Sequence, residues 1–578
     1  MAIRNMEWKG NRVLVIRAML VSVLTFFFVS VAWADDENGA FETATEAVKN
    51  MKVGWNLGNT FDSHNGSRVT NPRESETMWG QPVTKAELMQ MMHDAGFGAI
   101  RVPVTWYPHM DANNNVDVAW MKRVHEVVDY VLNTGMYCIL NVHHDTGADS
   151  NSTKSWLKAD ETVYNQQKEC FEFLWKQIAE EFKDYDEHLL FESYNEMLDT
   201  YNSWCFASFA APNSYNATVA TSAYNAINAY AQSFVNTVRA TGGNNAKRNL
   251  VVNTYAACCG SGTWNSHLQD PLKQMKLPDD ITEGHLIFQV HTYPNVDNLT
   301  SAKNEVSQTF RDLNTYLVSK GAPVIIGEWG TSSGNDYYDR RSNVLSFAKN
   351  FIEQSKTYGY GTFFWMGISD GPARSLPAFS QPDLAETILK AYYGEGYNPR
   401  LLTEDDYEIT SYLINYSGQW TELNLSSNEI SLSSYKGIRL ELGETPKNGS
   451  LQIKVYGETD SKTQHTNVTS AITTLNFNRT SLGAKSRRIT LQYMQTEPYS
   501  ISVNKVYLIK NDGTQVEVRV SPFWGCTMEA QSTKKPSGIV STTVNTPVDN
   551  HIYNLSGQRV LNPSRGIFIK NGKKILIY

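Results

Sequence analysis

Eight short apolar segments alternate with segments of helical periodicity between about residues 50 and 395, and this alternation constrains the fold most. The apolar segments lie at 53–57, 99–104, 137–145, 189–196, 249–254, 286–293, 323–330 and 361–367. Each is a nearly continuous apolar run, as is typical of a strand covered by protein on both faces. Eight such strands alternating with helices predict a (β/α)₈ barrel.

Helical patterns fill the intervals between these strands. They lie at 84–96, 118–135, 161–183, 215–240, 301–319 and 341–356. In the first, Thr84 and Glu87 have the spacing of a capping box, and Gly96 is the expected stop. A doubly wound open sheet is the alternative, but the glycine-rich phosphate turn expected after its first strand is missing, because "NLGNT" has the wrong spacing.

The sequence changes character after about residue 403, where the helical period disappears. Apolar residues now alternate with polar ones, in three sets: Ile438, Leu440 and Leu442; Leu451, Ile453 and Val455; and Ile489, Leu491 and Tyr493. Turn residues at 447–449 and 511–513 separate such runs. This pattern predicts an antiparallel, jelly-roll-like β-sandwich, followed by a small separate β unit.

The N-terminus has the pattern of a secretory signal. Basic residues up to Arg17 precede an apolar run that ends at a small-x-small site, Ala32-Trp33-Ala34. An uncleaved anchor helix is the alternative. Because no second apolar span follows, we expect a secreted, extracellular or cell-surface protein that has no stable membrane span. We also expect it to be a monomer.

The chain therefore divides into four predicted parts. They are a signal peptide at 1–34, a barrel domain at 35–400, an accessory sandwich at 401–545 and a tail at 546–578.

Charge and cysteine content argue against a nucleic-acid-binding protein, a disulfide-rich scaffold and a zinc protein. The net charge of −8 over 578 residues, with no long basic run, argues against nucleic acid as a partner. Six cysteines in so long a chain are no disulfide scaffold. Cys138 lies in a predicted strand and should be reduced. Cys205, Cys258 and Cys259 lie in predicted loops, where one disulfide bridge could form. No cysteine spacing resembles a zinc site.

Polar and aromatic residues gather where the predicted strands end. In a barrel these ends form one rim, which is the active face. The residues concerned are Arg101, His143, His144, Asp145, Asn195, Glu196, His291, Tyr293, Glu328, Trp329 and Trp365.

Each residue also has a purely structural interpretation. A single glutamate there could be a solvated loop residue, Arg101 an ion-pair partner, and Trp329 or Trp365 a packing residue. Adjacent strand residues point to opposite faces, so only one of His143 and His144 should face the pocket unless the strand bends. A metal site of His143, Asp145 and His291 is a further alternative. Glu192 lies deeper on the strand of Glu196 and should brace the barrel.

Glu196 and Glu328 together suggest a reaction. Cleaving the acetal between two sugars needs a proton on the leaving oxygen and a negative charge beneath the anomeric carbon. Two carboxyl groups supply both if one stays protonated while the other is ionised. Arg101 and Tyr293 would keep Glu328 charged, and His291 is placed to tune Glu196.

These residues and their order resemble glycoside hydrolase family 5, over about residues 50–390. The resemblance rests on the segments "GWNLGNTFD", "GFGAIRVPVTW", "ILNVHHD", "FESYNEM", "HTY", "IIGEWG" and "FFWMG". Each segment alone is weak evidence for the family, but the seven segments together, in this order and spacing, are highly specific. The usual "NEP" is "NEM" here, which changes packing and leaves the catalytic atoms in place.

The resemblance implies roles for individual residues. Glu196 would be the acid/base, Glu328 the nucleophile, and Asn195 a hydrogen-bonding partner of the sugar's 2-hydroxyl. Trp365 would stack under the reacting sugar. Support would come from Arg101, His143, His144, His291 and Tyr293, and further cleft residues would be Trp55, Asn56, Trp79 and Trp106. The resemblance implies neither a cofactor nor a metal.

The same resemblance suggests the substrate and two accessory roles. "GWNLGNT" with "HHD" is most similar to endo-β-1,4-glucanases acting on cellulose-type or mixed-linkage β-glucan; xyloglucan and β-mannan are alternatives. A non-catalytic surface glycan-binding protein is an alternative of another class. On the sandwich, Trp420, Tyr456 and Trp524 could bind sugar or could belong to the core. The tail resembles C-terminal sorting tails of secreted Bacteroidetes proteins.

Overall fold

The computed structural model describes residues 41–150, 155–209, 215–331, 340–426 and 429–535, and the backbone of four short strands between 552 and 577. The predicted signal peptide at 1–34 lies outside the described residues, as does most of the predicted tail. In the described part of the tail, β22 (Ile552–Tyr553), β23 (Arg559–Val560), β24 (Gly566–Lys570) and β25 (Lys573–Ile577) form one sheet.

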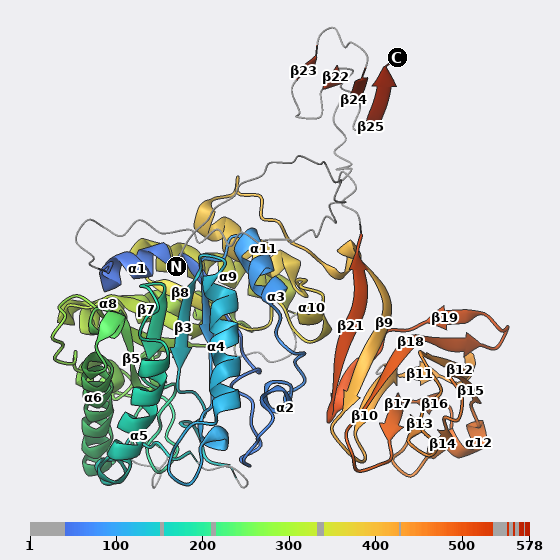
Figure 1. The fold of residues 1–578 in the computed structure, drawn as a ribbon, viewed down its shortest axis with the longest axis horizontal. Coiled ribbons are helices and arrows are strands. Elements are labelled where there is room, and N and C mark those ends of the chain that lie inside the picture. The colour runs from blue at the N-terminus through green and yellow to red at the C-terminus, as the bar shows by residue number, and fades with distance from the viewer. Residues whose placement is uncertain are drawn as a thin grey trace, which may run out of the picture. The chain divides into compact units, whose positions relative to one another are not determined.

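Eight parallel strands form a closed barrel (Figure 1), which confirms the predicted fold. They are β1 (Val53–Asn56), β2 (Ala99–Val102), β3 (Tyr137–Asn141), β4 (Leu189–Glu192), β5 (Leu250–Cys258), β6 (Leu286–Thr292), β7 (Val324–Trp329) and β8 (Gly361–Trp365). The barrel closes where β1 pairs with β8, with Asn56 opposite Trp365. Several strands end before the predicted ends, and the polar residues that follow leave the sheet.

Helices surround the barrel (Figure 1). The long ones are α3 (Ala86–Ala95), α4 (Val118–Leu132), α5 (Glu161–Glu181), α6 (Ala217–Ala240), α8 (Leu299–Tyr316), α9 (Arg341–Tyr358) and α11 (Pro382–Tyr393). Short ones are α1 (Ala44–Asn50), α2 (Pro72–Glu76), α7 (Asp270–Gln274) and α10 (Pro372–Ser375). Sequence periodicity located six of the long helices and missed α11.

The predicted capping box at Thr84 is wrong. The N-cap of α3 is Lys85, which makes no side-chain cap hydrogen bond. The amide of Thr84 instead donates to Oε1 of Glu76, at 2.6 Å, and its carbonyl accepts from Arg123. Arg123 and Glu76 form a buried ion pair, and this long-range contact fixes Thr84 outside the helix.

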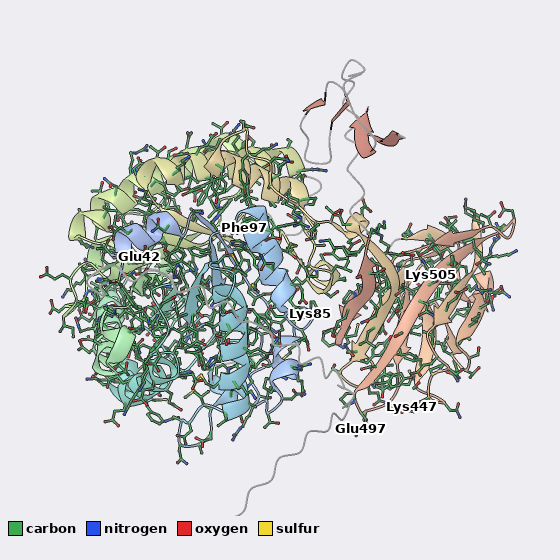
Figure 2. All side chains as sticks on the ribbon, turned by 45° about the horizontal axis from the view of Figure 1, so that its top comes forward. Glu42, Lys85, Phe97, Lys447, Glu497 and Lys505 are labelled. Carbon is green, nitrogen blue, oxygen red and sulfur yellow. The ribbon has the colours of Figure 1, made fainter. Side chains whose placement is uncertain are left out.

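Side chains are densely packed throughout the barrel domain (Figure 2), and an apolar cluster fills one end of the barrel interior. Leu190, Val251, Ile287 and Ile325 point inward and pack with α1 in one apolar cluster. Because α1 contributes Ala44, Ala47 and Val48 to this cluster, it closes one end of the barrel. The polar residues therefore collect at the opposite, carboxyl end of the strands.

The C-terminal region consists of antiparallel sheets, as predicted. Strands β14 (Thr463–Asn467), β13 (Leu451–Tyr456), β17 (Arg488–Tyr493), β10 (Glu422–Ser426) and β20 (Ser521–Trp524) form one sheet in that order. The other contains β15 (Ile472–Asn476), β12 (Tyr435–Leu442), β18 (Tyr499–Lys510), β9 (Tyr407–Tyr416) and β21 (Cys526–Lys534), with β19 (Gln515–Glu517) paired to β18. All three predicted alternating sets lie in the core that the two sheets share.

The six cysteines are free. Cys138 is buried in β3, which agrees with its predicted core position. Among the described residues, no helix combines the length and the apolar character needed to cross a membrane.

Candidate active site

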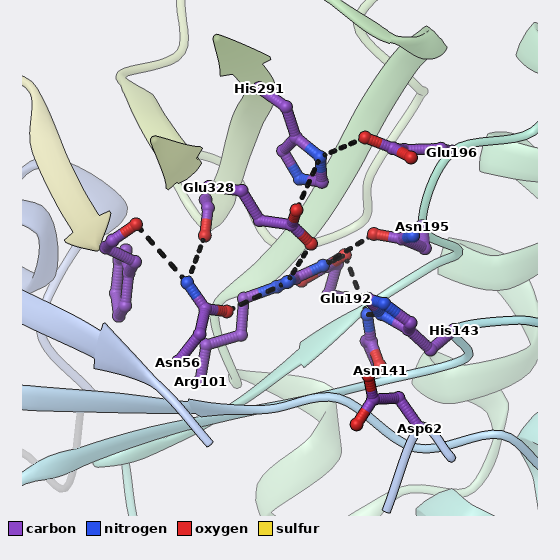
Figure 3. A network of polar contacts seen from close by, with 12 residues as sticks. Asn56, Asp62, Arg101, Asn141, His143, Glu192, Asn195, Glu196, His291 and Glu328 are labelled. Carbon is purple, nitrogen blue, oxygen red and sulfur yellow. Dashed lines mark hydrogen bonds and ion pairs between the residues drawn. The ribbon is translucent and has the colours of Figure 1, made fainter. Parts of the chain in front are cut away.

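A buried network of charges joins three barrel strands at the rim (Figure 3). Arg101 on β2 donates to both oxygens of Glu192 on β4, at 2.6 and 2.8 Å. It also donates to Oε1 of Glu328 on β7, at 2.7 Å. The guanidinium is fully buried, so two carboxylates and the amide oxygens of Asn56 and Asn195 satisfy its donors. Glu192 thus braces the barrel, as predicted.

Glu328 is held at both of its oxygens. Oε1 accepts from Arg101, and Oε2 accepts from the hydroxyl of Tyr293 at 2.7 Å. Burial raises the pKa of Glu328, and His291, Arg101 and Tyr293 oppose that rise. At neutral pH Arg101 and Tyr293 favour the ionised carboxylate, because an opposite charge and donated hydrogen bonds both stabilise it.

Glu196 follows the end of β4 and has fewer partners. Nδ1 of His291 lies 2.8 Å from its Oε1 and 3.5 Å from Oε2 of Glu328, so the imidazole stands between the two carboxyl groups. Burial raises the pKa of Glu196 to about 7, with Arg101 opposing. Burial also lowers the pKa of His291 to about 4, so at neutral pH this ring brings no positive charge to Glu196.

The two glutamates are close enough to act on one bond. One oxygen of Glu196, one oxygen of Glu328 and a nitrogen of His291 all lie within 4.8 Å of one another. The side chain of Glu196 is 23% exposed and that of Glu328 is 6% exposed. One carboxyl group therefore lies at the surface of the site and the other at its floor.

His143 and Trp365 form one wall of the site. Their rings lie parallel, with centroids 5.9 Å apart. Nδ1 of His143 accepts from Asn141, whose own orientation is fixed because its Oδ1 accepts from the amide of Val104. The proton of this neutral histidine is therefore on Nε2. Gly58, in the "NLGNT" segment, leaves room for Trp365, because a Cβ there would lie 2.9 Å from the indole.

His144 and Trp79 lie side by side next to that wall. Their ring centroids are 5.4 Å apart, and the indole of Trp79 donates to the carbonyl of His64. His144 also contacts the ring of His143 and lies 3.9 Å from Oδ2 of Asp62. β3 ends at Asn141, so the chain bends before both histidines and does not separate them onto opposite faces.

Several predicted cleft residues lie elsewhere. Trp55 and Trp106 are fully buried in the core, and their indoles donate to the carbonyls of Met366 and Asn141. Asn56 is also buried, so it supports Arg101 and does not line the cleft. Trp329 stacks on Phe351 inside the barrel wall.

The metal site considered for His143, Asp145 and His291 is not assembled. Both oxygens of Asp145 accept hydrogen bonds, from the amides of Trp106 and Tyr107 and from the indole of Trp156. Asp145 thus holds the loop after β2, and it belongs to neither of the two His/carboxylate groupings found among the described residues.

Sequence reasoning missed a pocket that opens from the site. Its volume is about 340 Å³, and it is lined by Glu196, His291, Tyr293 and loop residues that include Trp204 and Trp264. The end of β5 is irregular, since Ala256 and Ala257 both have positive φ, and this places Cys258 opposite His291. Trp264 is 58% exposed at the pocket. Because Trp264 lies in a loop, no periodic pattern of residues could have identified it.

Comparisons with known proteins agree with the geometry. A family model described as Cellulase (glycosyl hydrolase family 5) matches residues 62–370. Endoglucanase B of Neocallimastix patriciarum is 33% identical over 362 residues, which are 59% of this chain and 68% of that protein. Endoglucanase A of Clostridium longisporum is 34% identical over 349 residues, and the match covers 60% of its length.

Two solved structures are similar over the barrel. A GH5-4 broad specificity endoglucanase from an uncultured bacterium is 60% identical, with a TM-score of 0.60, and the match covers 61% of this chain and 97% of that one. A family 5 enzyme from Prevotella bryantii B14, solved in complex with a xyloglucan tetradecasaccharide, is 42% identical with a TM-score of 0.54. That match covers 61% of this chain and 99% of the other.

Proposed function

The chain belongs to glycosyl hydrolase family 5, and from that premise we propose that it is a secreted endo-β-1,4-glucanase that retains anomeric configuration. The observation that carries the proposal is the pair of carboxyl groups on either side of His291, with oxygens within 4.8 Å. Carboxyl groups roughly 5–5.5 Å apart are typical of retaining glycosidases, whereas inverting enzymes need about 6.5–9.5 Å to admit a water molecule.

In the first step Glu328 attacks the anomeric carbon and Glu196 protonates the leaving oxygen. A glycosyl ester forms on Glu328 as the bond to the leaving sugar breaks. The hydrogen bonds from Arg101 and Tyr293 keep the attacking carboxylate ionised. Glu196, which has no such cation at hydrogen-bonding distance among the described residues, holds the proton that the leaving group takes.

In the second step Glu196, now ionised, takes a proton from water, and the hydroxide so formed displaces Glu328 from the sugar. Two displacements at one carbon restore the original configuration. The amide nitrogen of Asn195 would bind the reacting sugar, and the hydrogen bond from Arg101 to its Oδ1 supports this, because it leaves the nitrogen as a donor. Nε2–H of His143 is a second donor, and Trp365 offers a partly exposed ring face.

A β-1,4-glucan chain is the proposed substrate, with xyloglucan as the second candidate. The xyloglucan complex of the Prevotella enzyme supports the second, and the naming of several relatives as endoglucanases supports the first. The pattern of residues 1–34 supports secretion, and we expect the enzyme to act as a monomer.

A polysaccharide panel tests the proposed reaction directly. We expect reducing sugar to be released from mixed-linkage β-glucan and xyloglucan, with less from β-mannan and xylan. Excess chelator should leave the rate unchanged, because the proposed steps use only side chains. Equal release by the native chain and by Glu328→Gln would contradict the assignment.

The pH dependence should follow the two glutamates. A general acid acts only while protonated, so kcat/KM should fall as the pH rises through about 7, the pKa of Glu196. The nucleophile acts only when ionised, so the acid limb should lie above the ordinary pKa of a glutamate, because the pKa of Glu328 is raised.

An aryl glycoside whose leaving group needs no proton provides the control. With this substrate the first step needs no proton donor, so kcat/KM of Glu196→Gln should show no fall near pH 7 while Glu328 still reacts. An alkaline limb that persists unchanged in this variant would assign that ionisation to another group.

A further inference from the structure

The outward face of the five-stranded sheet β14-β13-β17-β10-β20 is polar, and along its strands β10 and β17 it is also largely buried, which is an unusual combination. Along β17, Ile489 and Leu491 face the core, so Thr490 and Gln492 face outward. On β10, Leu423 and Leu425 face the core, so Asn424 faces outward. The outer surface of a sheet normally carries solvated polar residues, yet Thr490 is 0% and Asn424 is 7% exposed.

Three buried polar atoms on this face have no hydrogen-bond partner among the described residues. They are Oδ1 of Asn424, Oγ1 of Thr490 and Nε of Arg488. Asn424 and Thr490 are directly opposite each other across β10 and β17, and Arg488 lies two residues before Thr490 on the same face. Buried polar groups are nearly always paired, and an unpaired one destabilises the fold. Three unpaired polar atoms so close together indicate a place where a ligand supplies the missing hydrogen bonds.

Two exposed aromatic rings border these atoms. Trp524 is opposite Glu422 and Pro522 is opposite Leu423, so Phe523 is the extra residue of a β-bulge in β20. A bulge of this kind redirects side chains. Trp524 is 67% and Phe523 is 42% exposed, and neither belongs to the domain's apolar core.

The remaining residues of the face are ordered by hydrogen bonds. Tyr456 donates its hydroxyl to Glu422 at 2.8 Å, and Gln492 donates to the same carboxylate. Lys454 lies 3.4 Å from this carboxylate and balances its charge. The face therefore combines amide and hydroxyl groups, little net charge and two flat rings.

We propose that this face is a second glycan-binding site, which holds a neutral β-1,4-linked glucan chain outside the catalytic cleft. Sugar hydroxyls both donate and accept hydrogen bonds, which matches the unpaired amide oxygen, hydroxyl and guanidinium nitrogen. The apolar faces of glucose units match the rings of Trp524 and Phe523. The choice of glucan rests on the proposed function of the barrel.

Arg488 closes this site in the unbound chain. Its guanidinium carbon lies 3.8 Å from the centroid of Phe523, so it covers the ring face on which a sugar would stack. A change of rotamer of this long side chain frees the ring of Phe523 for a sugar. A sugar then takes the place of the guanidinium on the ring of Phe523, so the new stacking contact offsets the free energy of the lost cation–π contact.

Affinity electrophoresis in gels containing mixed-linkage β-glucan tests the site. All variants carry Glu328→Gln in the full chain, so that the polymer stays intact and the catalytic cleft contributes equally. We expect Trp524→Ala to raise the dissociation constant of the second site about tenfold, through the loss of a stacking ring. Thr490→Val should raise it about fivefold, through one lost hydrogen bond.

Stability separates a binding role from a structural one. Because Thr490→Val removes an unpaired buried hydroxyl at nearly constant volume, its melting temperature should be equal to or above that of the parent. Matched controls are Tyr507→Ala on β18 and Thr474→Val on β15, both on the outward face of the other sheet. Both should bind as the parent does.

Two outcomes would overturn the proposal. One is retardation of Trp524→Ala and Thr490→Val equal to that of the controls, and the other is a weaker-binding Thr490→Val that also melts at a lower temperature. Hydrolysis of cellopentaose by the chain with Glu328 intact is measured separately. If it is absent the barrel's proposed function fails, and the electrophoresis still decides the second site.

Discussion

Glu328→Gln should abolish nearly all hydrolysis while leaving the fold intact. The substitution keeps the size of the side chain and its hydrogen bond from Arg101, but an amide cannot form the glycosyl ester. We expect a loss of about 3–5 kcal/mol of transition-state stabilisation, or about 10²–10⁴-fold in kcat/KM on soluble β-glucan. The loss should appear in kcat, because ground-state contacts with the sugar remain.

The matched control for this variant is Glu441→Gln on β12, a partly exposed glutamate paired with Arg439. It should retain full activity and the melting temperature of the native chain. If Glu328→Gln keeps more than a tenth of native kcat, the carboxylate is not the nucleophile.

Arg101→Met should lower both stability and activity. Arg101 lies between the buried carboxylates of Glu192 and Glu328, so its removal leaves two like charges unpaired in the barrel. Breaking a buried pair in this way costs about 3–5 kcal/mol. Loss of the cation also raises the pKa of Glu328 further, so fewer molecules carry the ionised nucleophile at pH 6.

Arg123→Met provides the comparison, because Arg123 forms a similar buried pair with Glu76 away from the site. Urea unfolding should show comparable losses of stability for the two variants. kcat per folded molecule should fall for Arg101→Met alone. Equal kcat in both variants would restrict Arg101 to a purely structural role.

The barrel could be predicted because the sequence shows both the apolar runs of its strands and the helical periodicity of the segments between them. Continuous apolar runs such as 286–293 identify doubly covered strands, and helices such as α4 have a clear apolar stripe. The capping at Thr84 could not be predicted, because it depends on Glu76 and Arg123, which lie far from it in the chain.

The sequence predicted which residues would meet at the ends of the strands. It predicted less well which of their side chains face the cleft and which face the core. Glu196, Glu328, Arg101, His291 and Tyr293 lie together, because all follow or end strands of one barrel. The burial of Trp55 and Trp106 was not predictable, because an aromatic residue near a strand end suits a cleft and a core equally. Trp204 and Trp264 depend on loop conformation, including two left-handed residues at the end of β5.

The account depends most on Glu328 becoming covalently attached to the sugar. A 2-deoxy-2-fluoro cellobioside with a good leaving group should form the glycosyl-enzyme quickly and release it slowly, because the fluorine destabilises the oxocarbenium-like transition states of both steps. Peptide mass spectrometry should then find one added 2-deoxy-2-fluorocellobiosyl unit on the peptide of β7, at Glu328. An adduct on any other residue, or turnover with no adduct and inverted product, would contradict the account.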